Sequence, residues 1–164
     1  SMIEYKYIQN YSFEEDEGAA FIPSSWSVHK IGNTDELYVE NKKTDSLSGD
    51  KHYHFWSKQN DSVEFELEQE VKDLKEGKYK FSISIMGGDA GDMDIYAYVK
   101  INDEIIAKDE MIITSYNEWH SGLIEGFAYD GTSDLKVGIY VKCQGQGSGA
   151  WGKIDDALLN SMGE

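Results

Sequence analysis

This chain contains no arginine, one cysteine and one proline, and it has no long hydrophobic run. All 15 basic residues are lysine, against 31 acidic residues, and the net charge is −16. Without guanidinium groups, bidentate recognition of phosphate or carboxylate is excluded, and the negative field opposes nucleic acid and anionic membranes. The single cysteine, Cys143, cannot form an internal disulfide, and no apolar run approaches the ~18 residues that cross a bilayer. A neutral ligand, or one bridged by a cation, suits this composition.

Helical periodicity is also missing, and strict alternation of apolar and polar residues takes its place. Alternation of this kind is typical of half-buried strands, and clusters of Asn, Asp and Gly between the segments are typical of turns. The alternating segments are residues 63–71, 79–86, 94–101 and 135–144. At 164 residues the chain fits one domain. We predict an all-β, antiparallel sandwich or barrel, with residues 1–9 as a lead-in that opens on a cloning remnant, Ser-Met.

The alternation also sorts the outward-facing side chains into two kinds. Residues 64–70 present Glu at every second position, which indicates a solvated face. Other strands present Tyr, Trp, His and Lys opposite their apolar residues, which indicates a binding surface. Residues 29–50 are polar and irregular, and we expect a long loop there with one strand near 37–39. Trp26, in a Ser-rich stretch, is predicted to lie in the core.

Aromatic residues make up 13% of the chain, including 11 Tyr and 4 Trp, enough to line a ligand surface as well as a core. Rings of this kind stack on the apolar C–H faces of pyranose sugars, while neighbouring polar side chains bind the hydroxyl groups. The candidate rings are Trp56, Trp119, Trp151, Tyr96 and Tyr98. The candidate hydroxyl-binding residues are His54, Asp89, Asp92, Asp94, Lys142 and Gln144.

The segment 149–156, Gly-Ala-Trp-Gly-Lys-Ile-Asp-Asp, is the most informative stretch. Glycines on both sides leave the Trp151 indole unobstructed, and an exposed ring of that size indicates a recognition surface. The alternative is a core Trp that closes the sandwich beside two solvated acids.

Acidic clusters offer two candidate calcium sites. The loop 87–94 carries three Asp among glycines, but its spacing does not match an EF-hand, and we favour a role in orienting Asp side chains toward a ligand. The second candidate joins the acids at 14–17 to Asp155 and Asp156, because the termini of a sandwich often lie side by side. Backbone carbonyls of the turn 48–51 would complete the shell of six to eight oxygens that Ca²⁺ takes. The alternative is that these acids are simply exposed.

Zinc binding and catalysis find little support. His52 and His54 form an H-x-H pair, but zinc needs further ligands, and only His29, His120 and Cys143 remain. No nucleophile elbow, Ser-His-Asp order or phosphate loop is present. A glycosidase needs two carboxylates held across a cleft, and any chain this rich in Asp offers such pairs by chance.

Several motifs, taken in order, resemble carbohydrate-binding module family 61, the modules appended to bacterial family 53 endo-β-1,4-galactanases. The resemblance runs from about Asn10 to Leu159. The motifs are His54-Phe55-Trp56-Ser57, Gly77-x-Tyr79, Gly87-Gly88-Asp89-Ala90-Gly91-Asp92, Asp94-x-Tyr96-x-Tyr98, Val141-Lys142 and Gly149-Ala150-Trp151-Gly152-x-Ile154-Asp155-Asp156. The chain departs from the family in its lack of arginine, its turn at 101–103 and its longer loop at 144–148.

The resemblance implies a β-jelly-roll that binds β-1,4-galactan, the side chains of pectin, without cleaving it. It also implies a structural Ca²⁺ held by Glu14 and by Asp155 or Asp156. On this basis we expect a secreted bacterial module, monomeric, with an export signal outside this chain, that targets an attached galactanase to its substrate. The residues assigned to the sugar are Trp56, Trp119, Trp151, Tyr96, His54, Asp89, Asp92 and Lys142. The alternatives are a protein-interaction or adhesion sandwich and a small glycosidase or lyase.

Overall fold

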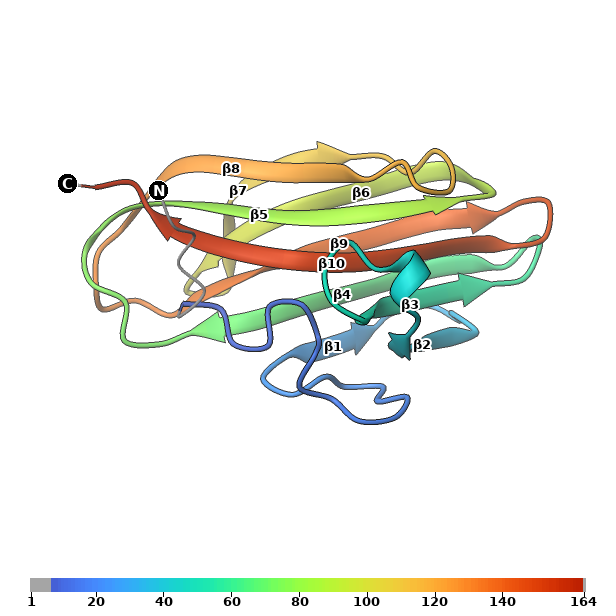
Figure 1. Cartoon of the computed structure of the whole chain (residues 1–164). Helices are drawn as coiled ribbons and strands as arrows, with labels where there is room; N and C mark the ends of the chain where they lie inside the picture. Colours follow the sequence, from blue (N-terminus) through green and yellow to red (C-terminus); the bar gives the residue numbers. More distant parts are fainter. Residues whose placement is uncertain (1–6, 164) are drawn as a thin grey trace.

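The computed structural model describes residues 7–163, and these form two five-stranded antiparallel sheets packed face to face (Figure 1). Sheet A has the order β1 (Ser27–Lys30), β4 (Ser62–Val71), β9 (Leu135–Gly145), β6 (Ala90–Ile101) and β7 (Glu104–Met111). Sheet B has the order β2 (Glu36–Asn41), β3 (Lys51–Ser57), β10 (Ala150–Ser161), β5 (Gly77–Gly88) and β8 (His120–Tyr129). The predicted all-β jelly-roll sandwich is confirmed.

The alternating segments form strands β4, β5, β6 and β9, as their sequence pattern predicts. In β4, Val63, Phe65 and Leu67 are fully buried between the sheets, whereas the intervening Glu side chains lie on the outer face of sheet A. The strand predicted near 37–39 is β2, and the 3-10 helix η1 (Lys43–Asp45) follows it in the connection to β3. Within residues 7–163, no helix is long and apolar enough to span a membrane.

Aromatic side chains from both sheets join the two layers. Phe65 of sheet A lies 5.5 Å from Phe55 and 6.2 Å from Tyr53 of sheet B, measured between ring centroids. Trp26 is 4% exposed, and its ring packs 5.4 Å from that of Phe13, so its predicted core position is confirmed. Burying rings of this size is a major part of the hydrophobic stabilisation of a sandwich.

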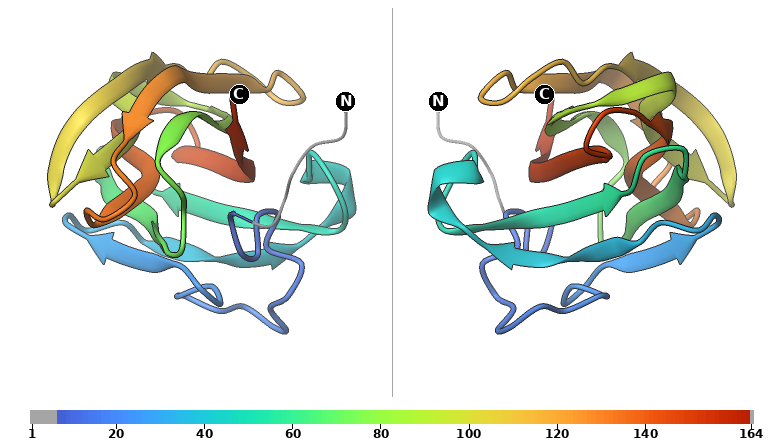
Figure 2. Two further views of the ribbon diagram at one scale, coloured as in Figure 1. Left: turned by 90° about the vertical axis from the view of Figure 1, so that its left-hand side faces the viewer. Right: turned by 90° about the vertical axis from the view of Figure 1, so that its right-hand side faces the viewer.

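Two segments extend over the outer face of sheet B. The β2–β3 connection with η1 lies in front of β3 and β10 in Figure 1, and the 112–119 segment leads from β7 into β8. Seen end-on, both project beyond sheet B on the same side (Figure 2). They meet where the Tyr116 hydroxyl donates to Asp45 Oδ1 at 2.9 Å.

The outer face of sheet A differs from the sequence-based expectation of separate Glu and aromatic faces. Because β4 pairs with β9, and β9 with β6, the Glu side chains and the tyrosines share one surface. Tyr140 Oη donates to Glu64 Oε2 at 2.5 Å, and Tyr98 Oη donates to Glu68 Oε1 at 2.7 Å. The Glu face is therefore half-buried and hydrogen-bonded, because phenol hydroxyls on the neighbouring strands reach its carboxylates.

Candidate functional site

Two tryptophans lie directly opposite each other on the outer face of sheet B. Trp56 of β3 pairs with Trp151 of β10, and Trp151 pairs in turn with Gly88 of β5. Their neighbours Phe55 and Ile154 point into the core, so the alternation turns both indoles outward. Both are partly exposed, and opposed side chains of an antiparallel pair have Cβ atoms ~5 Å apart. The two indoles therefore lie on one face of sheet B, which we call the tryptophan surface.

Two glycines leave room for the indoles, because a side chain at either position would collide with a ring. A Cβ on Gly88 would lie 3.0 Å from Trp151 Nε1, and one on Gly149 would lie 2.6 Å from Trp56 Nε1. Gly149 also has a φ of +106°, a conformation that L side chains rarely adopt. Trp56 Nε1 donates to the Ser148 carbonyl at 3.1 Å, which fixes the ring against the 144–149 loop. The glycines around 149 thus position Trp56 as well as Trp151.

The 112–119 segment places a third ring, that of Tyr116, beside this pair. The Tyr116 ring lies 6.4 Å from that of Trp151, tilted by 45°, and is half exposed. Its hydrogen bond to Asp45 raises the pKa of the Tyr116 phenol. Trp119 is partly exposed and directly precedes β8, whose first residue pairs with Ile85. Sequence reasoning named Trp119 but missed Tyr116, whose position depends on η1.

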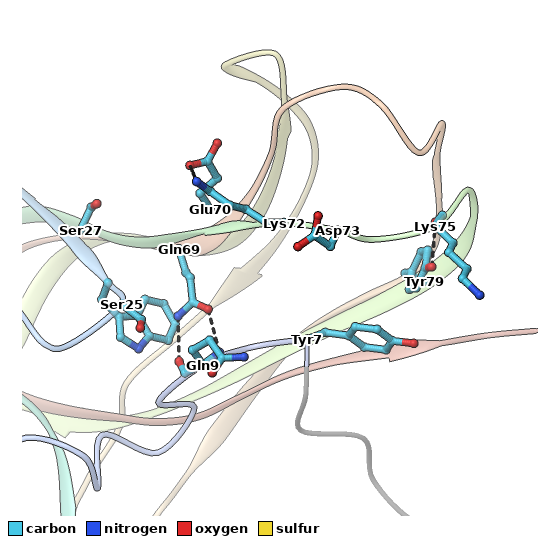
Figure 3. A pocket seen from close by; sticks show the side chains of 11 residues that line it. Tyr7, Gln9, Ser25, Ser27, Gln69, Glu70, Lys72, Asp73, Lys75 and Tyr79 are labelled. Atoms are coloured by element: carbon cyan, nitrogen blue, oxygen red, sulfur yellow. Dashed lines mark hydrogen bonds and ion pairs between the residues drawn. The ribbon is translucent and has the colours of Figure 1, made fainter.

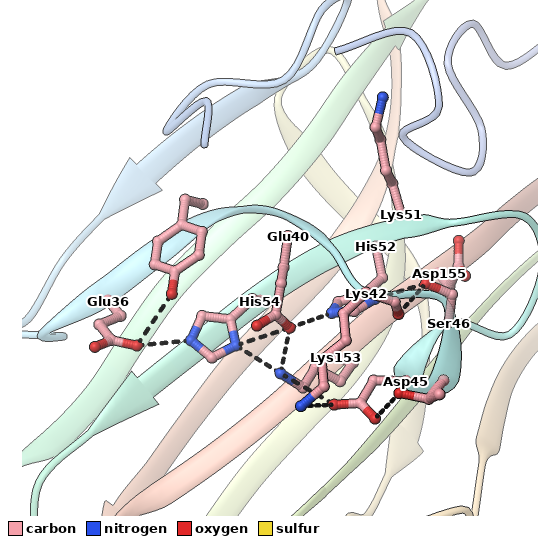
Figure 4. Close-up of polar contacts among 12 residues, drawn as sticks. Glu36, Glu40, Lys42, Asp45, Ser46, Lys51, His52, His54, Lys153 and Asp155 are labelled. Carbon is pink, nitrogen blue, oxygen red and sulfur yellow. Dashed lines mark hydrogen bonds and ion pairs between the residues drawn. The ribbon is translucent and has the colours of Figure 1, made fainter. Parts of the chain in front are cut away.

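A polar network begins two residues along β3 and β10 from the tryptophans, where His54 pairs with Lys153. Figure 4 shows its contacts. His54 Nδ1 lies 2.8 Å from Lys153 Nζ, and His54 Nε2 lies 2.8 Å from Glu36 Oε1. Burial lowers the pKa of the His54 imidazole, and the charge of Lys153 acts in the same direction, against the bond to Glu36. Both ring nitrogens that sequence reasoning assigned to sugar hydroxyls are thus engaged within the protein.

Glu40 holds the inner part of this network. Its Oε1 accepts from Lys153 Nζ at 2.6 Å and lies 2.7 Å from His52 Nε2. The hydrogen bond from His52 and then the contact with Lys153 outweigh the effect of burial and lower the pKa of Glu40 to about 2. His52 Nδ1 lies 2.9 Å from the Ser46 hydroxyl. The network therefore joins the β2–β3 connection, which contains η1, to the outer face of sheet B.

The other predicted sugar residues lie in two different places. Asp89 follows Gly88 in the β5–β6 turn and is exposed at the same end as Trp151, with Asp92 exposed three residues later. Tyr96 and Lys142 belong to β6 and β9 and lie on the outer face of sheet A. The tyrosine ring stacks 5.0 Å from Tyr140. These two predicted sugar residues therefore lie on a different sheet from Trp56 and Trp151, because the alternation assigns a residue to a face without assigning its strand to a sheet.

The three predicted calcium residues converge on one turn. Asp155, fully buried, accepts from the backbone N–H groups of Leu47 and Ser48, and Asp156 contacts the Ser48 hydroxyl. Glu14 accepts from the backbone N–H of Asp50 at 3.1 Å. Burial, together with the charge of Asp156, raises the pKa of Asp155 to about 8. Within residues 7–163, no three Asp, Glu, His or Cys side chains are grouped closely enough to hold a metal.

A separate cavity of about 820 Å³ lies where the N-terminal segment crosses the far end of β4 and β5 (Figure 3). Tyr7, Trp26 and Tyr79 contribute rings to its lining. The amide of Gln69 bonds the backbone of Gln9 through both its oxygen and its nitrogen, each at 2.8 Å. The cavity shares no lining residue with the tryptophan surface of sheet B.

No protein-family model matches the sequence, and a comparison with curated proteins finds none that is similar. The structure, in contrast, is similar to that of TmCBM61 in complex with β-1,4-galactotriose. The two chains are 25% identical, with a TM-score of 0.75, and the match covers 98% of this chain and 99% of that chain.

Two further modules show the same fold at 12% identity. The CBM22-1 xylan-binding domain from Paenibacillus barcinonensis Xyn10C has a TM-score of 0.53, with 94% of this chain and 93% of that chain covered. The C-terminal family 22 carbohydrate-binding module of Clostridium thermocellum Xyn10B has a TM-score of 0.57, with 96% and 94% covered. The resemblance to carbohydrate-binding module family 61 is confirmed by the first of these structures, and the two family 22 modules share the fold.

Proposed function

We propose that this chain is a carbohydrate-binding module that holds β-1,4-galactan against Trp56 and Trp151 without cleaving it. The observation that carries the proposal is the register of β3 and β10, which places two outward-facing indoles side by side. The galactotriose bound to the structurally similar TmCBM61 supports the choice of ligand. Polymer binding of this kind would bring an attached glycoside hydrolase to pectin side chains.

Ring stacking and hydroxyl binding would act together at this surface. A galactose ring has an axial O4, so its apolar C–H patch lies on one face, and that face would rest on the indoles. Polar groups at the rim would bind the hydroxyls that point outward, and Asp89 is one exposed candidate. At the non-reducing end of the chain, where O4 is a free hydroxyl, a glucose unit places it equatorially and would leave such a partner unpaired, which disfavours glucose.

The proposal includes a structural Ca²⁺ beside Glu14, Asp155 and Asp156. These carboxylates and the Ser48 hydroxyl meet at the 47–51 turn, and oxygen donors of this kind suit a hard cation. Because the side chains alone are too few, backbone carbonyls of the turn would complete the shell. The ion would join the N-terminal segment, the β2–β3 connection and β10.

Affinity electrophoresis in gels containing galactan, xylan, mannan or β-glucan tests the proposal. We expect retardation by galactan alone, and quenching or a shift of tryptophan fluorescence when galactotriose is added. Migration unaffected by galactan would overturn the proposal and favour an adhesion or protein-interaction sandwich. Release of reducing ends from galactan, abolished by a single carboxylate substitution, would instead identify a glycosidase.

The cellular setting is part of the same proposal. We infer a secreted bacterial module that acts as a monomer within a larger galactanase. Size-exclusion chromatography with light scattering tests the monomer, and a dimer that forms in the absence of sugar would contradict it.

A further inference from the structure

The protonation of His54 follows from its partners. The Lys153 ammonium can only donate a hydrogen bond, and it lies 2.8 Å from His54 Nδ1. Nδ1 therefore accepts, and the neutral imidazole carries its proton on Nε2. That nitrogen donates to Glu36 Oε1 at 2.8 Å. The ring has no nitrogen left for a sugar hydroxyl. The outermost group of this network is instead the carboxylate of Glu36, to which the ring is bonded.

Glu36 lies beside Trp56 on the outer face of sheet B. It pairs directly with Trp56 across β2 and β3, and its side chain is 42% exposed. Its Oε1 takes the bond from His54 and a long contact of 3.5 Å with the Tyr38 hydroxyl. Its second oxygen points away from His54 (Figure 4) and has no partner among the described residues. A fixed carboxylate thus presents a free acceptor at the edge of the tryptophan surface.

Lys153 is itself held in place. It is 5% exposed and donates to Glu40 Oε1 at 2.6 Å, with Asp45 Oδ2 at 3.9 Å. The Tyr38 ring packs 4.7 Å from the His54 ring and restricts its rotation. A chain of polar contacts therefore leads from Glu40 through Lys153 and His54 to Glu36. It fixes the orientation of the Glu36 carboxylate.

We propose that Glu36 is a specificity-determining residue that accepts hydrogen bonds from hydroxyl groups of the sugar stacked on Trp56, with His54 as its positioning residue. This inference rests on the proposed function. An ionised carboxylate accepts stronger hydrogen bonds than a neutral group, and an oriented one selects sugars whose hydroxyls reach it. Neither role was predicted from the sequence, which placed His54 itself on the sugar.

Calorimetric titration of Glu36→Gln with galactotriose tests the carboxylate. Hydrogen bonds to charged groups are worth ~1.5–3 kcal/mol, so we expect an affinity about 10- to 100-fold weaker. Glu36→Ala should show a similar loss. The control is Glu110→Gln, which removes the same charge from an exposed position on β7 of sheet A and should bind as the unmodified protein does.

The outcomes separate this inference from the proposed function. If Glu36→Gln and Glu36→Ala bind normally while Trp151→Ala does not, Glu36 is excluded and the galactan module stands. If Trp151→Ala also binds normally, the proposed function fails. Thermal unfolding of each variant shows that it is folded, and β2 is an edge strand whose Glu36 side chain is partly exposed.

The positioning role has its own signature. Imidazole ¹⁵N shifts should show His54 protonated on Nε2, both free and with galactotriose bound. His54→Gln should weaken binding several-fold while Glu36→Gln in the same background adds little, because the carboxylate is no longer oriented. A ring protonated on Nδ1, or fully additive losses, would overturn the assignment of His54.

Discussion

Gly88 lies so close to the indole of Trp151 that a Cβ at this position would come within 3.0 Å of Nε1. The same Cβ would lie 3.4 Å from the Thr114 carbonyl, so the 112–119 segment closes the space from the other side. The glycine is therefore part of the tryptophan surface, because its lack of a side chain lets the Trp151 ring approach β5 closely. Gly88, which precedes the β5–β6 turn, is thus needed for the position of the Trp151 indole as well as for the turn.

Gly88→Ala should turn the Trp151 indole away from β5 and weaken galactan binding about 3- to 10-fold. The ring can move, so the free energy of unfolding should fall by only ~1 kcal/mol, at the low end for overpacking. Fluorescence titration and urea unfolding measure the two effects. Gly77→Ala, at the other end of the same strand with no contact under 3.5 Å, is the matched control. Normal binding by Gly88→Ala would show that the position of the indole is unimportant.

Trp151→Ala should remain folded and lose about 10- to 100-fold in affinity, because central aromatic rings are the usual hot spots of a binding surface. Trp56→Ala should behave in the same way, since the two rings form one surface. Trp26→Ala is the contrasting variant: its ring is buried against Phe13, and its loss should cost ~3–5 kcal/mol of stability. Cooperative unfolding lost in Trp151→Ala would instead identify a core residue.

Tyr96→Ala should leave galactan affinity within about two-fold, although sequence reasoning assigned Tyr96 to the sugar. The residue lies on sheet A, stacked on Tyr140 with Lys108 Nζ 4.6 Å from its ring centroid. Loss of these contacts should lower the free energy of unfolding by ~1–2 kcal/mol. Binding and unfolding measured on one preparation distinguish the two roles, and a large loss of affinity would place a second sugar surface on sheet A.

Much of the fold could be predicted because the alternation of apolar and polar residues along a strand reflects which side chains are buried, and this pattern can be read from the local sequence. Val63, Phe65 and Leu67 could be placed in the core, as could Trp26. The sheet to which each strand belongs could not be predicted, because pairing such as that of β4 with β9 joins residues far apart in the chain. Tyr96 and Trp56 show equivalent local patterns and yet lie on opposite outer faces of the sandwich.

Of the candidate site, the tryptophans and Asp89 could be predicted from the sequence, but not Tyr116 or Glu36. Trp151 lies between glycines, and Trp56 and Trp119 each have a His within two residues, local patterns that indicate exposed rings. Glu36 and Tyr116 belong to segments with no such signal, and they reach the site through long-range contacts with β3 and with η1. Lys153 resembles an ordinary outward-facing lysine of a strand, and its burial depends on the η1 connection that covers it.

Removal of Ca²⁺ should lower the melting temperature without abolishing the fold. A ligand that binds only the native state adds RT ln(1 + [L]/Kd), or ~2.7 kcal/mol at one hundred times Kd. Calorimetry with EDTA and with added CaCl₂ measures the shift. Asp156→Asn should melt at the same temperature in both conditions, whereas Glu104→Gln, an exposed residue of β7, should respond as the unmodified protein does. An unmodified protein that is insensitive to EDTA would exclude the ion.

Glu40→Gln should destabilise the protein most at neutral pH and progressively less in acid. His52 and Lys153 lower the pKa of Glu40 to about 2, against 4.5 ordinarily. A carboxyl group with a depressed folded-state pKa contributes its full stability above the unfolded value and loses it as the pH falls from about 5 to about 2. The full shift would correspond to ~3.4 kcal/mol at pH 7. Because the carboxylate is partly exposed, solvent screening reduces this contribution to ~2–3 kcal/mol, and less than half of it should remain at pH 3.

Urea unfolding of the unmodified protein and of Glu40→Gln at pH 7, 5 and 3 measures the gap between their free energies of unfolding. Glu110→Gln removes an exposed carboxylate that lies 4.0 Å from Lys108, and it should shift stability by less than ~0.5 kcal/mol at every pH. A gap for Glu40→Gln that stays constant with pH would mean that the loss comes from altered packing, since a change in packing does not titrate. A gap that narrows below pH 5 would show that the ionised carboxylate holds Lys153 and His52 together, and with them the support of the tryptophan surface.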